Sequence, residues 1–190
     1  MDSLTALKHL NNKIKRCTKC TLSRTRKNAV PGEGNPKAKI MFIGEAPGVK
    51  EDEIGRPFVG RGGKLLTVLL KEIRLERKEV FITSILKCKP PGNRNPNKKE
   101  IVACEPYLWK QIELIKPKLI CTLGNFSTKL ILENCGFKFE GVTKIHGKTY
   151  SIAGIKIMPL FHPAYIIRGK PSRLPLTKKD FKKIKRIIKN

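Results

Sequence analysis

The chain has 190 residues, of which 41 are Lys or Arg and 15 are Asp or Glu, and its formal net charge is +26. This length suits one domain over residues 1–190, and a hydrophobic content of 39% excludes a disordered chain. No apolar stretch approaches the roughly 20 residues that span a bilayer, and the first residues lack the charged-then-apolar order expected of a signal peptide. We therefore expect a cytoplasmic protein. The charge favours nucleic acid as partner over a membrane surface or a merely Lys-rich exterior.

The first half of the chain predicts two helices and two strands. Ser3 is a suitable N-cap for a first helix, which carries apolar residues at helical spacing up to Ile14. The Gly- and Pro-rich stretch that follows Cys20 reads as a loop. Short buried strands are expected over residues 39–44 and 79–86, with a helix over residues 62–73 between them.

The second half continues the alternation of helix and strand. Helices are expected over 97–115, opened by Asn97, and over 125–134, with a strand over 118–124 between them. The segment 148–161 reads as two strands around a turn at Ala153-Gly154, and a basic helix covers about 176–189. This alternation predicts an α/β fold with a mostly parallel sheet and helices on both faces.

Ligands of such sheets bind at the carboxyl ends of the strands. These ends are rich in Gly, Pro and polar residues here, and they read GEAPG, TSILKCKPP, LGN and FHPAY. We therefore expect a shared crevice at this edge. The sequence fits neither a dinucleotide fingerprint nor a P-loop, which disfavours a nucleotide-handling enzyme.

The cysteines suggest a second site. Cys17 and Cys20 form a C-x-x-C pair after a helix, and Cys88 and Cys104 follow later in the chain. Disulfides, zinc or a [4Fe–4S] cluster would each suit four such residues, and the spacing does not separate these alternatives. Cys121, inside an apolar strand, reads as a buried core thiol.

Acidic residues gather where a polyanion binder would be expected to avoid them. Glu45, Glu51, Asp52 and Glu53, four of the 15 acids, lie within nine residues just after the first strand. Asp52 and Glu53 read as solvated surface charges. The position of Glu45 and Glu51 in a protein that binds a polyanion requires a chemical explanation.

Motifs along nearly the whole chain, from Cys17 to about Arg173, resemble the family-4 (type-4) uracil-DNA glycosylases, the iron–sulfur type. The resemblance rests on CTKC, VPGEGNPKAKIMFIGEAPG, EDEIGRPFVGRGGKLL, VFITSILKCKPPGNRNP, CTLGN and FHPAYIIR, in this order. It implies a single domain with a central, mostly parallel four-stranded sheet flanked by helices. The abundance of Lys, Ile and Arg also suits a thermophilic, archaeal source.

The resemblance implies one structural [4Fe–4S] cluster, held by Cys17, Cys20, Cys88 and Cys104. It also implies a monofunctional glycosylase that flips uracil out of DNA and hydrolyses the N-glycosidic bond, in base excision repair. The alternative is a non-catalytic iron–sulfur or zinc module that binds nucleic acid.

Uracil excision supplies a reason for the acids, because the transition state carries a cationic sugar that needs negative charge or an activated water. The resemblance makes Glu45 that carboxylate and His162 the donor to uracil O2, for which a neutral imidazole suffices. It places Glu51 beside the base, against thymine's methyl group, and Phe58 as the aromatic that stacks on it. The expected uracil-binding residues are Gly44, Glu45, Ala46, Glu51, Phe58, Ser84 and His162.

The segment after His162 resembles the loop that enters the minor groove. The expected DNA contacts are Tyr165, Arg168, Lys170 and Arg173. The substrate is single- or double-stranded DNA containing uracil, and the protein is expected to be a nucleoid-associated monomer. A sliding clamp is a further candidate partner, although no convincing clamp-binding motif is present.

One position departs from the family pattern. Family members commonly have Asn three residues before the Lys-Cys pair, where it pairs with the uracil edge, and this chain has Ser84. The shorter hydroxyl can make one direct contact. A looser base pocket is therefore expected.

Overall fold

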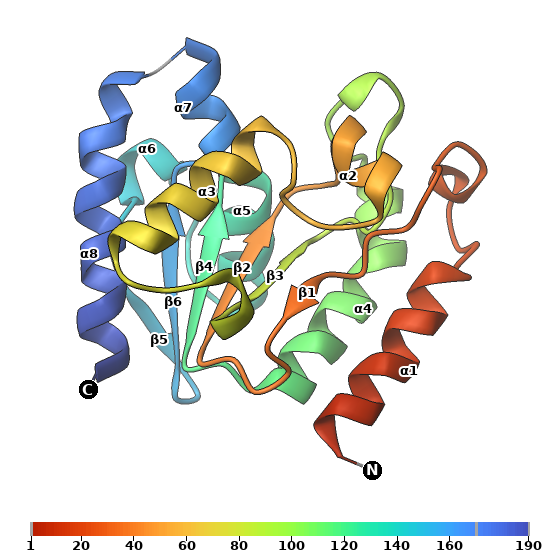
Figure 1. The fold of residues 1–190 in the computed structure, drawn as a ribbon, viewed down its shortest axis with the longest axis horizontal. Coiled ribbons are helices and arrows are strands. Elements are labelled where there is room, and N and C mark those ends of the chain that lie inside the picture. Colours follow the sequence, from red (N-terminus) through yellow and green to blue (C-terminus); the bar gives the residue numbers. More distant parts are fainter. Residues whose placement is uncertain (1, 170, 190) are drawn as a thin grey trace.

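The computed structural model describes residues 2–169 and 171–189. These residues form a six-stranded sheet with helices on both faces (Figure 1). In the order β1-β3-β2-β4-β6-β5 across the sheet, the four central strands are parallel and each edge strand is antiparallel to its neighbour. The strands are β1 (Glu33–Gly34), β2 (Ile40–Gly44), β3 (Phe81–Ser84), β4 (Leu119–Leu123), β5 (Tyr150–Ile152) and β6 (Ile155–Leu160).

The connections between the strands are mostly helical. The α-helices are α1 (Ser3–Lys15), α2 (Val49–Ile54), α3 (Arg61–Glu72), α4 (Lys98–Ile115), α5 (Asn125–Asn134), α6 (Val142–Ile145), α7 (Pro163–Gly169) and α8 (Leu174–Lys189). Short 3-10 turns are η1 (Thr21–Arg24), η2 (Arg77–Glu79), η3 (Pro91–Asn93) and η4 (Pro171–Arg173). None of the described helices is long and apolar enough to cross a membrane.

The expected α/β class with helices on both faces is confirmed, but the expected count of four strands is wrong. The sheet has six strands and is only partly parallel. The extra strand β1 is two residues long and lies in the Gly-rich stretch, where no apolar alternation marks it. The hairpin predicted at Ala153-Gly154 is confirmed, because both residues have positive φ (47° and 80°) between β5 and β6.

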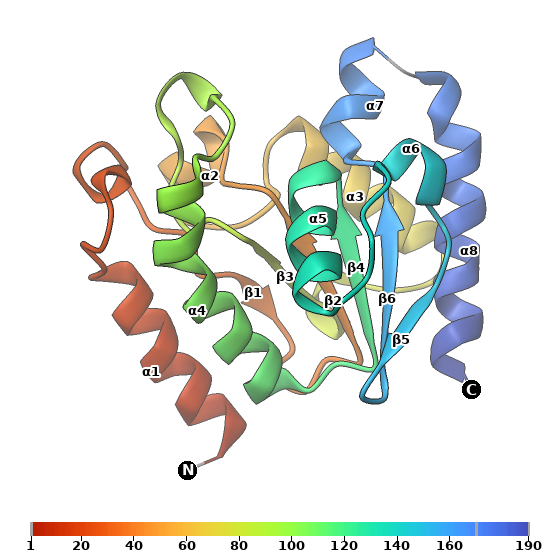
Figure 2. The same ribbon diagram turned by 180° about the vertical axis from the view of Figure 1, so that it is seen from behind.

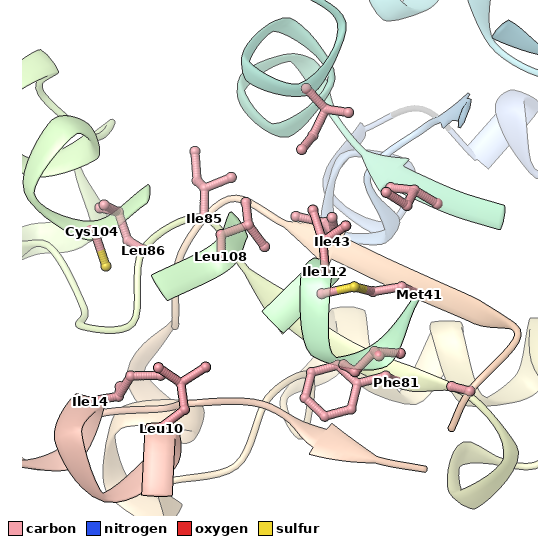
Figure 3. Packing of buried hydrophobic residues seen from close by; sticks show 14 of the residues in the cluster. Leu10, Ile14, Met41, Ile43, Phe81, Ile85, Leu86, Cys104, Leu108 and Ile112 are labelled. Atoms are coloured by element: carbon pink, nitrogen blue, oxygen red, sulfur yellow. The ribbon is translucent and has the colours of Figure 1, made fainter. Parts of the chain in front are cut away.

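Alternation along β2 divides the core between the two faces of the sheet. Met41 and Ile43 pack with residues of α1, α4 and α5, as the close view of this cluster shows for Leu10, Ile14, Leu108 and Ile112 (Figure 3). Ile40 and Phe42 point to the other face, against α3 and α8. Figures 1 and 2 show these two helical layers from opposite sides. A strand buried on both faces is apolar throughout, which explains the unbroken IMFI run.

Two helix starts show how local chemistry sets the boundaries. Asp2, rather than the predicted Ser3, caps α1: its carboxylate accepts a hydrogen bond from the Thr5 N–H at 2.8 Å. Asn97 caps α4 as predicted, in a reciprocal capping box with Glu100. Both caps lie one residue before the helix and satisfy backbone donors that no helical carbonyl can reach.

The carboxyl ends of the parallel strands meet at one edge of the sheet. The arrowheads of β2, β4 and β6 point to the edge where α2 and α7 lie, and the labelled N- and C-terminal ends lie at the opposite edge (Figure 1). The four segments singled out in the sequence therefore meet at this edge.

Candidate active site

A cleft of about 580 Å³ opens at this edge of the sheet. Each of the four central parallel strands contributes to its lining, through Glu45 after β2, Ser84 at the end of β3, Gly124 after β4 and His162 after β6. Of the residues predicted to bind uracil, Glu45, Ala46, Glu51, Phe58, Ser84 and His162 line the cleft, as do Tyr165 and Arg168 of α7. The topology thus brings together residues that are far apart in the sequence.

His162 is held in one tautomer by its own turn. Its Nδ1 accepts a hydrogen bond from the Ala164 backbone N–H at 3.1 Å, so the ring proton belongs on Nε2. Burial, assisted by the positive charge of Arg168, lowers the pKa of His162 to about 4. The imidazole is therefore neutral near pH 7, and its Nε2–H has no acceptor among the described residues. This is a donor available to a ligand.

Glu45 follows β2 directly, and its backbone is fixed because its carbonyl accepts from the Leu86 N–H at 3.0 Å. Its carboxylate accepts no hydrogen bond within the part of the chain that the structure describes. Burial raises the pKa of Glu45, and the positive charge of Arg168 acts in the opposite direction. A half-buried carboxylate without a partner can interact with a cationic or proton-donating ligand.

Phe58 lies beside His162 and lines the same cleft as Glu45. Its ring centroid is 5.8 Å from that of His162, and the two rings are tilted by 32°. Gly44 allows this approach, since a Cβ there would lie 2.5 Å from the Phe58 Cζ. Gly44 therefore acts through Phe58 and is not itself part of the cleft lining.

Ser84 is 6% exposed and lies near Gly44, as a Cβ on that glycine would come 3.3 Å from the Ser84 Oγ. No described residue hydrogen-bonds this hydroxyl. The hydroxyl is thus available to a ligand in the cleft, and its contact with uracil stays a prediction.

Glu51 has a defined structural task besides lining the cleft. Its carboxylate accepts hydrogen bonds from the backbone N–H groups of Gly48, Val59 and Gly60, at 3.1, 2.8 and 2.7 Å. It therefore fixes the loop between α2 and α3, which carries Phe58. The sequence reading assigned Glu51 to the base alone, because loop hydrogen bonds leave no periodic signal.

The prediction that Asp52 is a solvated surface charge is wrong. Asp52 is 2% exposed, and its carboxylate accepts from the Lys27 and Asn28 backbone N–H groups at 3.0 and 3.3 Å. These bonds attach α2 to the N-terminal loop and replace the water that the carboxylate loses. Glu53 is exposed and pairs with Lys50 at 2.8 Å, as expected of a surface residue.

The residues predicted to contact DNA lie partly inside and partly outside the cleft lining. Tyr165, 39% exposed, stacks on Phe161, and Arg168 donates from Nε to the Ala164 carbonyl at 3.3 Å. Arg173 lies over the Phe161 ring at 5.6 Å and outside the cleft lining. Lys170 lies outside the described residues.

Several cleft residues were not predicted. Arg61 at the start of α3, Asn93 and Arg94 after the Pro-Pro pair, and Asn125 at the start of α5 also line the cleft. Asn125 accepts from the Val142 N–H at 3.0 Å and so attaches α6 to the rim. Asn125 is the Asn of the LGN strand end, and that position was the available signal; the loop before α4 offered none.

The four predicted cluster ligands line a second, small cavity between α1, the loop after β3 and α4. Cys88 and Cys104 are buried, and Cys17 and Cys20 are partly exposed. Two of the sulfurs accept hydrogen bonds. Arg26 donates to Cys88 at 3.0 Å, and the backbone N–H of Lys87 donates to Cys104 at 3.3 Å. Among the described residues, no three metal-binding side chains are grouped closely enough to hold a metal ion. The argument that these cysteines suit a cluster therefore rests on the cavity that they share and on the hydrogen-bond donors beside their sulfurs. Cys121 is fully buried in β4, as predicted.

The fold and the cleft define a class of protein: an α/β protein with a cleft at the carboxyl ends of its parallel strands, where ligands of such sheets bind. Residues 31–189 match the family described as the uracil DNA glycosylase superfamily. The chain is 50% identical to a type-4 uracil-DNA glycosylase of Sulfurisphaera tokodaii, over 98% of this chain and 86% of that protein. It is also 50% identical to one of Saccharolobus solfataricus, over 93% and 84%, and 48% identical to one of Pyrobaculum aerophilum, over 87% and 86%.

The chain therefore belongs to the uracil-DNA glycosylase superfamily, and within it to the type-4 family. The resemblance drawn from the sequence motifs is confirmed, and the three relatives named here come from archaeal and thermophilic sources.

Proposed function

We propose that the protein removes uracil from DNA by hydrolysing the bond between uracil N1 and the sugar C1′, leaving an abasic site for base excision repair. The observation that carries this proposal is that one cleft holds both a neutral His162 donor and a Glu45 carboxylate that has no partner among the described residues. Membership of the type-4 family supports the same activity.

The two residues suit the two charges that develop as the bond breaks. The bonding electrons move to uracil, whose O2 gains negative charge, and His162 Nε2–H is the donor that meets it. The sugar becomes cationic, and Glu45 stabilises it or orients the water that attacks C1′. The water oxygen then bonds to C1′ and its proton passes to the carboxylate or to solvent. Of the acids that follow β2, Glu45 would thus serve the sugar, whereas Glu51 and Asp52 fix loops of the fold.

Binding of the base would use the remaining cleft residues. Phe58 would stack on the flipped uracil, and Ser84 would make one contact with its edge. Glu51 supports this arrangement by fixing the Phe58 loop, and we propose that it also restricts space near the methyl position of thymine. Phosphate contacts would come from Tyr165, Arg168, Lys170 and Arg173, as the sequence predicts, together with other Lys and Arg residues.

Cys17, Cys20, Cys88 and Cys104 would hold one [4Fe–4S] cluster, because all four line one cavity beside sulfur-directed donors. When bound, the cluster would supply a covalent connection between α1, the loop after β3 and α4. Its cavity has no lining residue in common with the cleft, so it takes no part in the chemistry proposed above.

The activity is tested with a DNA oligonucleotide that contains one uracil, incubated with the protein and then treated with alkali. Strand breakage that depends on uracil is the expected result, because alkali cleaves DNA at abasic sites. Binding without breakage would instead indicate a non-catalytic nucleic-acid-binding module. An oligonucleotide with thymine at the same position is the control.

A further inference from the structure

Phe58 has a backbone conformation that its own sequence does not favour. Its φ is +50°, in the left-handed region that bulky side chains rarely occupy, and the residue is 9% exposed. Such a conformation persists only where the surroundings hold it in place. The contacts that hold it therefore determine where the ring lies in the cleft.

Arg77 of η2 supplies those contacts from outside the cleft. Its Nη1 donates to the Phe58 carbonyl at 3.0 Å, and its Nη2 donates to the Pro57 carbonyl at 2.7 Å. Nη1 also approaches the Thr67 Oγ1 of α3 at 3.4 Å. Two successive carbonyls of the loop thus converge on one guanidinium group.

Glu33 of β1 holds the guanidinium in turn. Its Oε1 accepts from the Arg77 Nε and Nη2 at 3.2 and 2.6 Å, and its Oε2 accepts from Arg56 at 2.7 Å. With these bonds all five N–H donors of Arg77 are engaged. Arg77 and Glu33 are 19% and 22% exposed, so the pair is largely shielded from solvent.

The other side of the loop is held by groups already described. Glu51 accepts the N–H groups of Val59 and Gly60, while Arg77 donates to the carbonyls of the two residues before them. Gly63 leaves room for the loop, since a Cβ there would collide with the Phe58 carbonyl. The peptide units around Phe58 are therefore restrained by an anion on one side and a cation on the other.

We infer that Arg77, oriented by Glu33, is a positioning residue that sets the Phe58 ring against the flipped base. This inference rests on the proposed function, because it requires Phe58 to stack on uracil. Arg77 does not line the cleft and acts only through Phe58.

The test measures single-turnover excision of uracil by Arg77→Lys, which keeps the charge but has three donors in place of five. The expected result is a loss of roughly 10 to 100-fold in rate, because small displacements of positioned groups have effects of this size, with DNA affinity unchanged. Lys78→Gln is the matched control, since Lys78 lies on the same turn and pairs with Glu76 at the exposed surface. Its rate should equal that of the wild type.

A double-mutant cycle separates positioning from general support of the fold. In a Phe58→Ala background the ring is gone, so Arg77→Lys should change the rate by less than about twofold, while it still lowers Tm. Glu33→Gln is a milder second variant. It should lower the excision rate less than Arg77→Lys does, and this loss should disappear in the Phe58→Ala background.

Three outcomes overturn the inference. Equal rates for Arg77→Lys and Lys78→Gln would do so, as would the same loss for Arg77→Lys with and without Phe58. A wild-type protein that releases no uracil would overturn the proposed function itself, and this inference with it. If the wild type is active but the effects of the two substitutions simply add, the inference is overturned and the proposed function stands.

Discussion

The cleft and the cysteine cavity differ in how their polar atoms are satisfied. In the cleft, His162 Nε2, the Glu45 carboxylate and the Ser84 hydroxyl have no partner among the described residues, although hydrogen bonds fix the His162 ring and the Glu45 backbone. In the cavity, the sulfurs of Cys88 and Cys104 already accept hydrogen bonds from Arg26 and Lys87. Polar groups that bind a substrate need donors or acceptors that the protein leaves unused. The sulfurs of Cys88 and Cys104 instead already accept hydrogen bonds from neighbouring residues. This contrast can be tested at each site.

The largest effect is expected from Glu45→Gln, which keeps the shape of the side chain and removes its charge. The excision rate should fall by about 10² to 10⁴-fold, the range of general acid–base contributions. Single-turnover kinetics on a uracil oligonucleotide measures this loss. Glu53→Gln is the matched control, because Glu53 is an exposed acid of the same segment. Equal rates for the two variants would remove Glu45 from the chemistry.

His162→Ala should follow, with a loss of about 100 to 1,000-fold in rate, as is typical for one donor to a developing oxyanion. Binding of DNA should remain nearly intact, because contacts with phosphates supply most of the affinity. Excision and an equilibrium binding titration are measured on the same oligonucleotide. A drop in affinity that matches the drop in rate would make His162 a DNA-contacting or structural residue.

The cysteine cavity should respond in stability and colour rather than in a single chemical step. Protein purified anaerobically should be brown with about four irons per chain. Cys88→Ser should lose the colour and lower Tm. Cys135→Ser is the control, since Cys135 ends α5 away from the cavity lining. Iron analysis and thermal unfolding test both variants; stoichiometric zinc in a colourless, active preparation would contradict the cluster.

A smaller effect is expected at Ser84, the departure from the family pattern. Ser84→Asn would add a donor and an acceptor toward the uracil edge, which corresponds to about 1–3 kcal/mol of base discrimination. The ratio of uracil to hypoxanthine excision should then rise roughly 10 to 100-fold. Wild type, Ser84→Asn and Ser84→Ala are compared on uracil, hypoxanthine and cytosine substrates. Identical selectivity in all three would show that Ser84 does not read the base.

The pH profile should change gradually rather than in one step. Burial raises the pKa of Glu45, and the reaction needs the ionised carboxylate, so the rate should fall as the pH drops through that raised pKa. The slope should approach about tenfold per pH unit. His162, with a pKa of about 4, stays neutral over this range and adds no second limb near pH 6 to 7. An acidic limb that persists in Glu45→Gln would belong to another group.

Sequence reasoning succeeded where the signal is local or periodic. Apolar runs and caps predicted the four central strands and the long helices, and the strand ends predicted the cleft that contains Glu45 and His162. The short edge strand β1 was missed, since two residues carry no alternation. Ser3 and Asp2 are both residues that cap helices, and only the backbone geometry shows that Asp2 caps α1.

The sequence by itself determined the fold class, the family, and which residue types gather at the strand ends, because these follow from patterns along the chain. Only the tertiary structure decided what each acid does. Asp52 is buried under the N–H groups of a loop far away in sequence, and Glu51 fixes the Phe58 loop. Arg77 reaches the same loop from another element. Hydrogen bonds between distant segments depend on where the packed core places their backbones, and no periodicity in the sequence records that.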